Sequence, residues 1–146
     1  MTESEGRRRR ISTEHPILQE LEEQAREARK SLVARGHLVS KAELAARLGV
    51  VPAELDAAVR EERLFFLEVG SPGSVEPYFP AFYADPAWNR SELERVCMAM
   101  GDLGGGAKWH FFVRPHAYFL GSTPLEALQK GRLEEVERAA FAYAER

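Results

Sequence analysis

The chain has 146 residues with an ordinary balance of hydrophobic and charged side chains, 45% and 29%. A chain of this length can bury a core without metals or disulfides, and its one cysteine, Cys97, excludes an internal disulfide and fits a reducing cytoplasm. The net charge of -3 gives no overall attraction to nucleic acid, and no run of about 18 apolar residues predicts a membrane span. We therefore expect a globular, cytoplasmic protein with no membrane partner.

The N-terminal segment contains two contrasting stretches. Residues 1–14 are polar and carry their charges in blocks, which predicts a disordered basic arm. An amphipathic helix is expected from Pro16 to Arg35, because apolar residues recur at spacings of three and four and Gly36 follows as a stop. The apolar positions are Ile17, Leu21, Ala25, Ala28 and Leu32.

The segment SKAELAARLGVVPAELDAAVREER contains two short helices separated by a tight turn. Ser40 is the expected N-cap of the first helix, with Glu43 in the capping-box position, and Gly49 is its stop. Pro52 is the expected first residue of the second helix. Two short helices divided by a glycine turn predict a helix-turn-helix motif.

A β-hairpin is predicted directly after these helices. Two aromatic and aliphatic runs, RLFFLEV and EPYFPAFYA, flank GSPGSV, which indicates two strands joined by a wide turn. Pro77 and Pro80 predict that the second strand lies at an edge of the sheet. Since a hairpin in this place would be a wing, residues 15–86 are predicted to form a winged helix-turn-helix domain.

The predicted recognition helix has few groups that read DNA bases. Its first residues, 51–54, are Val-Pro-Ala-Glu and offer no donor to guanine or adenine. Backbone contacts by basic residues and groove contacts by the arginine arm remain available, as do apolar contacts with thymine methyls. Two alternatives therefore stay open. The module binds a specific DNA sequence, or it binds DNA only weakly or serves for protein contacts instead. The candidate DNA-contacting residues are Lys41, Arg47, Arg60 and Arg63.

Residues 87–146 are predicted to be helical throughout, so the expected fold class is mainly α with a small β-hairpin, the winged helix-turn-helix being followed by a helical bundle. One of these helices is short and sharply bounded: Thr123 is its N-cap, Pro124 its first residue, Glu126 completes a capping box, and Gly131 ends it. The others are expected at about Ser91 to Met100, around Lys108 to Val113, and at about Leu133 to Ala144.

No catalytic constellation is visible in the sequence. The stretch GDLGGGAK resembles a phosphate-binding loop incompletely, because Lys108 comes one position late and Trp109 replaces the hydroxyl residue. His110 and His116 match no metal-binding motif, and Cys97 lies on an apolar helical face typical of a packing residue. We therefore expect a protein that is not an enzyme and that binds no cofactor or metal.

The stretch WHFFVRPHAYFLGSTPLEALQKGRLEEVERAAFAY resembles the toxin-binding domain of Xre/MbcA/ParS-like antitoxins. In that domain a tryptophan and a proline precede L-G-x-[ST]-P-L, a short helix, a glycine, and a helix carrying a valine. The resemblance covers about residues 88–144 and is densest from Leu120 to Gly131. It implies a partner, a RES-domain toxin, which is an NAD-consuming enzyme that such antitoxins bind and block. Matching residues are Trp109, Leu120, Gly121, Thr123, Pro124, Leu125, Leu128 and Gly131.

The resemblance also implies where the partner binds. In such antitoxins the C-terminal tail can reach toward the toxin's active site, which makes Tyr143 and Arg146 candidates. The full predicted partner-binding set is Trp109, Leu120, Thr123, Pro124, Leu125, Leu128, Tyr143 and Arg146.

Two functions are weighed for the whole chain. The first is an antitoxin that neutralises a RES-domain toxin, with DNA binding and autoregulation, and that forms homo-oligomers through aromatic surface. The alternative is a stand-alone helix-turn-helix transcriptional regulator or an oligomerising adaptor without a toxin.

The scarcity of base-reading donors predicts how DNA binding depends on salt. Contacts confined to phosphates should weaken steeply between about 50 and 200 mM salt and show little sequence preference. Fluorescence anisotropy with a candidate operator duplex and a scrambled duplex measures both properties. Tight operator binding at physiological salt, with weak binding to the scrambled duplex, would contradict this expectation.

Overall fold

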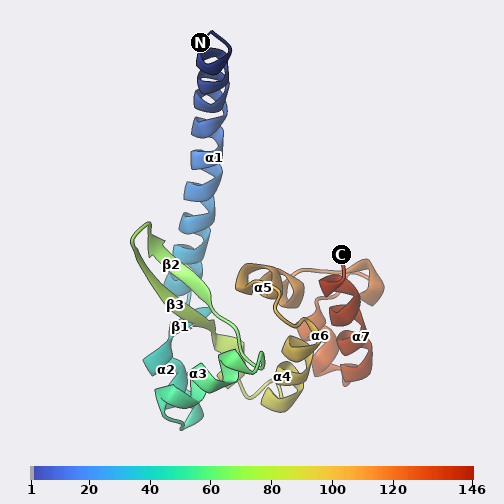
Figure 1. Ribbon diagram of the computed structural model, residues 1–146. Helices are drawn as coiled ribbons and strands as arrows, with labels where there is room; N and C mark the ends of the chain where they lie inside the picture. The colour runs from blue at the N-terminus through green and yellow to red at the C-terminus, as the bar shows by residue number, and fades with distance from the viewer. Residues whose placement is uncertain (1) are drawn as a thin grey trace.

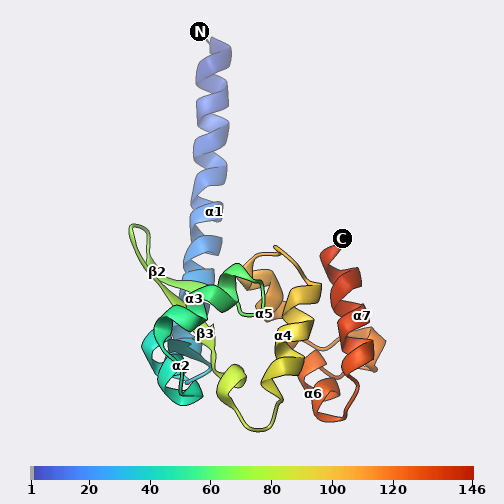
Figure 2. The ribbon, with the colours of Figure 1, turned by 60° about the horizontal axis from the view of Figure 1, so that its bottom comes forward.

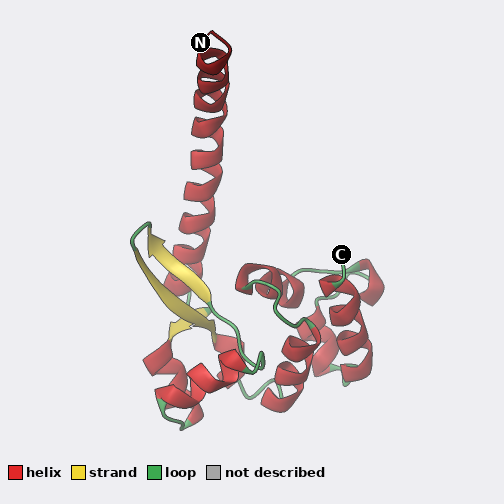
Figure 3. Cartoon of the chain, viewed as in Figure 1, coloured by secondary structure: helices red, strands yellow, loops and turns green. Residues whose placement is uncertain are grey.

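The computed structural model describes residues 2–146, which form a mainly helical chain with a small three-stranded antiparallel sheet (Figures 1 and 3). The predicted fold class is confirmed at this level, although only two of the three strands were expected. Within residues 2–146, none of the helices combines the length and the apolar content needed to cross a bilayer.

Helix α1 runs from Thr2 to Ala34, and its N-terminal half stands clear of the rest of the chain (Figures 1 and 2). The disordered arm expected over residues 1–14 therefore differs from the structure, which describes residues 2–14 as part of this helix. Glutamate and arginine, which make up much of this segment, are good helix formers. The predicted stop is confirmed, since Gly36 adopts a left-handed φ of 79°.

Helix α2 (Lys41–Leu48) begins and ends at the predicted signals, and α3 (Pro52–Arg60) begins at the predicted proline. The Ser40 hydroxyl accepts a hydrogen bond of 3.2 Å from the Glu43 N–H. Gly49 ends α2 in the left-handed conformation that a side chain would disfavour. Each helix buries one face in the core through Leu44 and Leu55.

The sheet has the order β1-β3-β2, with strands β1 (Leu38–Ser40), β2 (Leu67–Ser71) and β3 (Ser74–Pro80). The prediction that the proline-containing strand lies at an edge is wrong, because β1 was not foreseen and pairs with its outer side. Pro77 pairs only with β2 and Pro80 only with β1, while Tyr78 alone pairs on both sides. Each proline thus lies where β3 has one neighbour, so its missing N–H can face the open side.

The turn between β2 and β3 is tight, not wide as predicted. Ser71 pairs directly with Ser74, which leaves only Pro72 and Gly73 in the turn. Proline sets φ for the first turn position, and Gly73 takes a positive φ of 83° at the second.

The C-terminal half consists of four α-helices, as predicted. Helices α4 and α7 pack against each other and are joined by an ion pair from Arg95 to Glu137. Short 3-10 turns that the sequence did not indicate lie at Ala81–Ala84 and Ala117–Phe119. The four helices are α4 (Arg90–Ala99), α5 (Gly105–Val113), α6 (Pro124–Gln129) and α7 (Leu133–Ala144).

One hydrophobic core extends through both halves of the chain. Phe65 stacks on Phe112 with ring centroids 5.9 Å apart, and Phe82 stacks on Trp109 at the same distance. Cys97 is fully buried and free, as expected for a packing residue, and burial raises the pKa of its thiol. The parts of the chain on either side of the predicted boundary at residues 86 and 87 therefore pack against each other in one core.

Gly105, at the start of α5, permits the closest approach between the two halves. A Cβ atom added there would lie 1.9 Å from the carbonyl oxygen of Phe66, a backbone atom that cannot rotate away. The glycine-rich loop is thus explained by packing at this position.

We expect Gly105→Ala to lower the free energy of unfolding by about 3 kcal/mol, because the methyl group forces α5 away from the Phe66 carbonyl, which lies just before β2. Gly106→Ala is the matched control, since its Cβ would meet only the flexible end of Arg29, at 3.1 Å. The control should stay within about 1 kcal/mol of the parent chain in urea denaturation. Equal effects of the two variants would show that the close approach is unimportant.

Candidate functional site

Most of the candidate DNA-contacting residues already pair with carboxylates. Arg60 is exposed, and among the described residues it has no ion pair. A phosphate would therefore compete with an internal partner at the other three positions. Those pairs are Lys41 with Asp56 (2.8 Å), Arg47 with Glu43 (2.9 Å), and Arg63 with Glu61 (2.7 Å) and Glu94 (3.3 Å).

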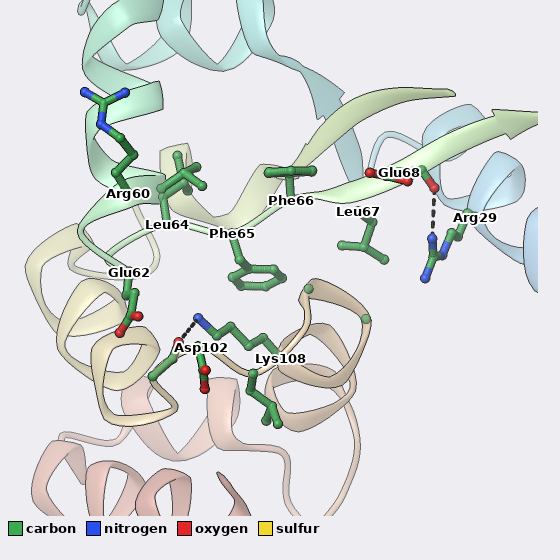
Figure 4. Close-up of a pocket in the computed structure, with 15 residues that line it drawn as sticks. Arg29, Arg60, Glu62, Leu64, Phe65, Phe66, Leu67, Glu68, Asp102 and Lys108 are labelled. Atoms are coloured by element: carbon green, nitrogen blue, oxygen red, sulfur yellow. Dashed lines mark hydrogen bonds between the residues drawn. The ribbon is translucent and has the colours of Figure 1, made fainter. Parts of the chain in front are cut away.

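A cavity of about 450 Å³ lies between the end of α3, strand β2 and the loop before α5 (Figure 4). The incomplete phosphate-loop segment lines it, including Asp102 and Lys108. Lys108 is nearly fully buried, and its ammonium donates a hydrogen bond of 2.7 Å to the carbonyl of Gly101. Figure 4 shows this ammonium directed at the carbonyl. Lys108 thus ties the end of α4 to α5, which explains its presence without a phosphate.

The part of the chain that the structure describes contains no cluster of three or more His, Cys, Asp or Glu side chains arranged to hold a metal ion. His110 and His116 lie on different segments. His110 is on α5, where burial and then the charges of Arg114 and Arg29 lower its pKa. His116 precedes the 3-10 turn at Ala117–Phe119.

Several residues of the predicted partner-binding set lie inside the protein. Pro124, Leu125 and Leu128 are buried, and Trp109 stacks on Phe82. The backbone of α6 is held as well, because Trp88 Nε1 donates a hydrogen bond of 2.8 Å to the Leu125 carbonyl. Charged substitutions at Leu125 and Leu128, two residues of the predicted partner-binding set, would therefore disrupt folding before they could report on partner binding.

Tyr143 and Arg146, in contrast, come together at the C-terminal end of α7. They line a cavity of about 350 Å³ with residues of the segment before α6. Sequence reasoning missed the other side chains of this site, although Arg138, Ala142 and Arg146 follow one another at a helical spacing of four. The cavity is lined by His116, Tyr118, Arg138, Ala139, Ala142, Tyr143 and Arg146.

Leu120 is the most exposed large hydrophobic residue described, at 95% relative exposure. It follows the turn that carries Tyr118 and adopts a left-handed φ of 56°, which is unfavourable for leucine. The hydrogen bond from the Leu120 N–H to the Ala117 carbonyl (3.0 Å) and the buried Phe119 hold this conformation. The turn thus presents an apolar side chain to solvent at a conformational cost.

We define the C-terminal surface as Leu120 together with the lining of this cavity. Arg138 and Arg146 give it positive charge, while Tyr118, which is about half exposed, adds apolar area. The His116 Nε2 atom is buried and has no hydrogen-bond partner within the described chain. Such a surface can accept an apolar segment flanked by carboxylates.

The capping box of α6 fixes the backbone that directly follows Leu120 and its turn. The Thr123 hydroxyl accepts a hydrogen bond from the Glu126 N–H (3.1 Å), and Glu126 accepts one from the Thr123 N–H (3.0 Å). These bonds, the one from the Thr123 backbone first, lower the pKa of the Glu126 carboxyl. Thr123, a predicted contact residue, therefore already has a structural role.

Thr123→Ala should lower the free energy of unfolding by about 1 kcal/mol at neutral pH, whereas Ser122→Ala, next to the cap, should change it by less than about 0.5 kcal/mol.

Because folding lowers the Glu126 pKa, the contribution of this carboxylate to stability is present above the unfolded pKa and is lost as the pH falls below about 4.5. Glu126→Gln can keep the box without this loss. Thermal melts from about pH 7 to pH 3 should therefore show the melting temperatures of the parent chain and Glu126→Gln moving closer together on acidification. A constant difference between them would contradict the role of the Glu126 carboxylate.

Comparison of this chain with protein-family models, with curated proteins and with solved structures gave no match.

Proposed function

We propose that this chain is a non-catalytic binding protein of the antitoxin kind, which captures a RES-domain toxin on its C-terminal surface and contacts DNA weakly through a winged helix-turn-helix. The proposal starts from the resemblance of residues 88–144 to the toxin-binding domain. The geometry of the C-terminal surface adds independent support, since a protein of this class works by presenting a rigid face to its partner.

The single observation that carries the proposal is the fully exposed Leu120 in a left-handed turn. A leucine in this conformation costs roughly 1 kcal/mol relative to glycine or asparagine and gains nothing from burial in the free chain. Backbone strain clusters at functional sites, and exposed apolar residues that lie together mark interaction surfaces, as Leu120 and the half-exposed Tyr118 do on this turn. The caps of α6 fix the neighbouring backbone before binding, which lowers the entropy lost on association.

The N-terminal half supports the DNA-contacting part of the proposal through its order of elements. Helices α2 and α3 meet at the Gly49 turn, and the β2–β3 hairpin follows α3, as a wing would. The few uncompensated basic side chains on this motif favour weak backbone contacts over base reading.

Co-expression with a candidate toxin is the decisive experiment. A RES-domain reading frame beside the gene would be expressed alone and together with the tagged chain. We expect the toxin to co-purify and growth to be restored when both are present. If the pair neither co-purifies nor restores growth, the antitoxin proposal fails, and a regulator or adaptor without a toxin remains.

Leu120→Asn locates the surface without disturbing the fold. Asparagine tolerates a left-handed backbone and removes the apolar side chain, so the variant should fold normally and bind the toxin at least about tenfold more weakly. Val75→Asn, at an exposed aliphatic residue of β3, is the matched control and should bind like the parent chain. Unchanged capture by folded Leu120→Asn would place the contact elsewhere.

A further inference from the structure

Helix α1 carries an apolar stripe that the rest of the chain leaves uncovered at one end. Leu18 and Leu21 are 55% and 56% exposed, and Ile17 beside them is 61% exposed. Figure 1 shows this part of α1 projecting away from the sheet and from the C-terminal helices. The stripe follows the alternating spacing of three and four residues found in coiled coils. Its members are Leu18, Leu21, Ala25, Ala28 and Leu32.

Toward its C-terminal end the stripe forms one wall of a groove of about 580 Å³. Helix α5 supplies the other wall through Trp109 and Val113. Past Leu32 and Trp109 the groove meets a cavity of about 650 Å³, which Phe82 and Leu125 also line. Apolar side chains therefore line a continuous depression from the exposed stripe to Leu125 in the first turn of α6.

The groove and the exposed helix carry opposite charges. The residues that line the groove include three arginines and one histidine but no carboxylate; the basic members are Arg29, Arg35, His110 and Arg114. The segment of α1 from residue 20 to residue 27 carries four glutamates and one arginine. A helix with the sequence of α1 thus suits this groove by both shape and charge.

We propose that the groove between α1 and α5 binds α1 of a second copy of this chain, in antiparallel orientation, to form a two-fold symmetric dimer. The arrangement places Leu21 of each copy against Leu32 of the other and Ala25 against Ala28, so small residues lie where the helices come closest. Glu22 then lies beside Arg29 of the second copy. Each groove is filled by the helix that the other copy exposes, as an isologous interface requires.

This register also accounts for the exposed leucines. When Leu21 lies opposite Leu32, Leu18 lies opposite Arg35 and Ile17 opposite Gly36 of the second copy. Both Arg35 and Gly36 line the 650 Å³ cavity, which continues the groove toward Trp88 and Leu125. The apolar tip of the stripe is thereby removed from water, and no further protein is needed to cover it.

Leu21→Glu tests the interface, because Leu21 is too exposed in the single chain for the variant to unfold it. Sedimentation velocity should give twice the mass of one chain for the parent protein and a dissociation constant raised at least about tenfold for the variant. Val51→Glu, at an aliphatic residue of similar exposure (58%) near α3, should remain dimeric. A monomeric parent chain at micromolar concentration overturns the proposal, and so does a dimer that Leu21→Glu leaves intact.

Cysteine cross-linking tests the orientation. Leu21→Cys combined with Leu32→Cys should form disulfides between copies under oxidation, whereas Leu21→Cys alone should not, because the two Leu21 positions lie about 16 Å apart along the helices. Charge exchange checks the register: Glu22→Arg should weaken the dimer, and Arg29→Glu in addition should restore it. Cross-linking by Leu21→Cys alone, or no restoration by the charge exchange, overturns the antiparallel register. These measurements need no toxin, so they stand apart from the test of partner capture.

Discussion

The contact on which the rest of the structure depends is the aromatic packing between the two halves of the chain. Phe82 stacks on Trp109, and Phe65 stacks nearly parallel on Phe112, with 3° between the ring planes. Stacked rings bury large areas and fix the angle between the elements that carry them. Helices α5 and α6 are thereby held at a set position relative to α1 and the sheet, and Gly105 lets the backbones come close enough for the rings to meet.

This packing divides the C-terminal residues into those that form the core and those that face solvent and are free to contact a partner. The resemblance to antitoxins does not distinguish these two groups, because the matched pattern contains residues that form and cap the short helix as well as residues on the surface. Trp109, Leu125 and Leu128 contribute to the core, whereas Leu120 and Arg146 face solvent. The two proposed contacts also lie in different places: the C-terminal surface is at the end of α7, and the groove runs between α1 and α5. The linings of the two cavities share no residue.

Part of the candidate site was predictable and part was not. Tyr143 and Arg146 were identified through the resemblance, and the helical spacing of Arg138, Ala142 and Arg146 could have extended the set. Tyr118 and the exposure of Leu120 could not have been found, since neither a left-handed turn at a leucine nor the approach of that turn to α7 leaves a periodic signal. The role of Lys108 was equally hidden, because its partner is the carbonyl of Gly101 at the other end of the loop.

The sequence by itself determined where α2 and α6 begin and end, because Ser40, Gly49, Thr123 and Gly131 act on the backbone within a few residues of themselves. Only the tertiary structure decided that β3 lies between β1 and β2, and which side chains of α6 are buried. Strand order and burial depend on contacts between segments far apart in the chain, whose energies no local pattern contains.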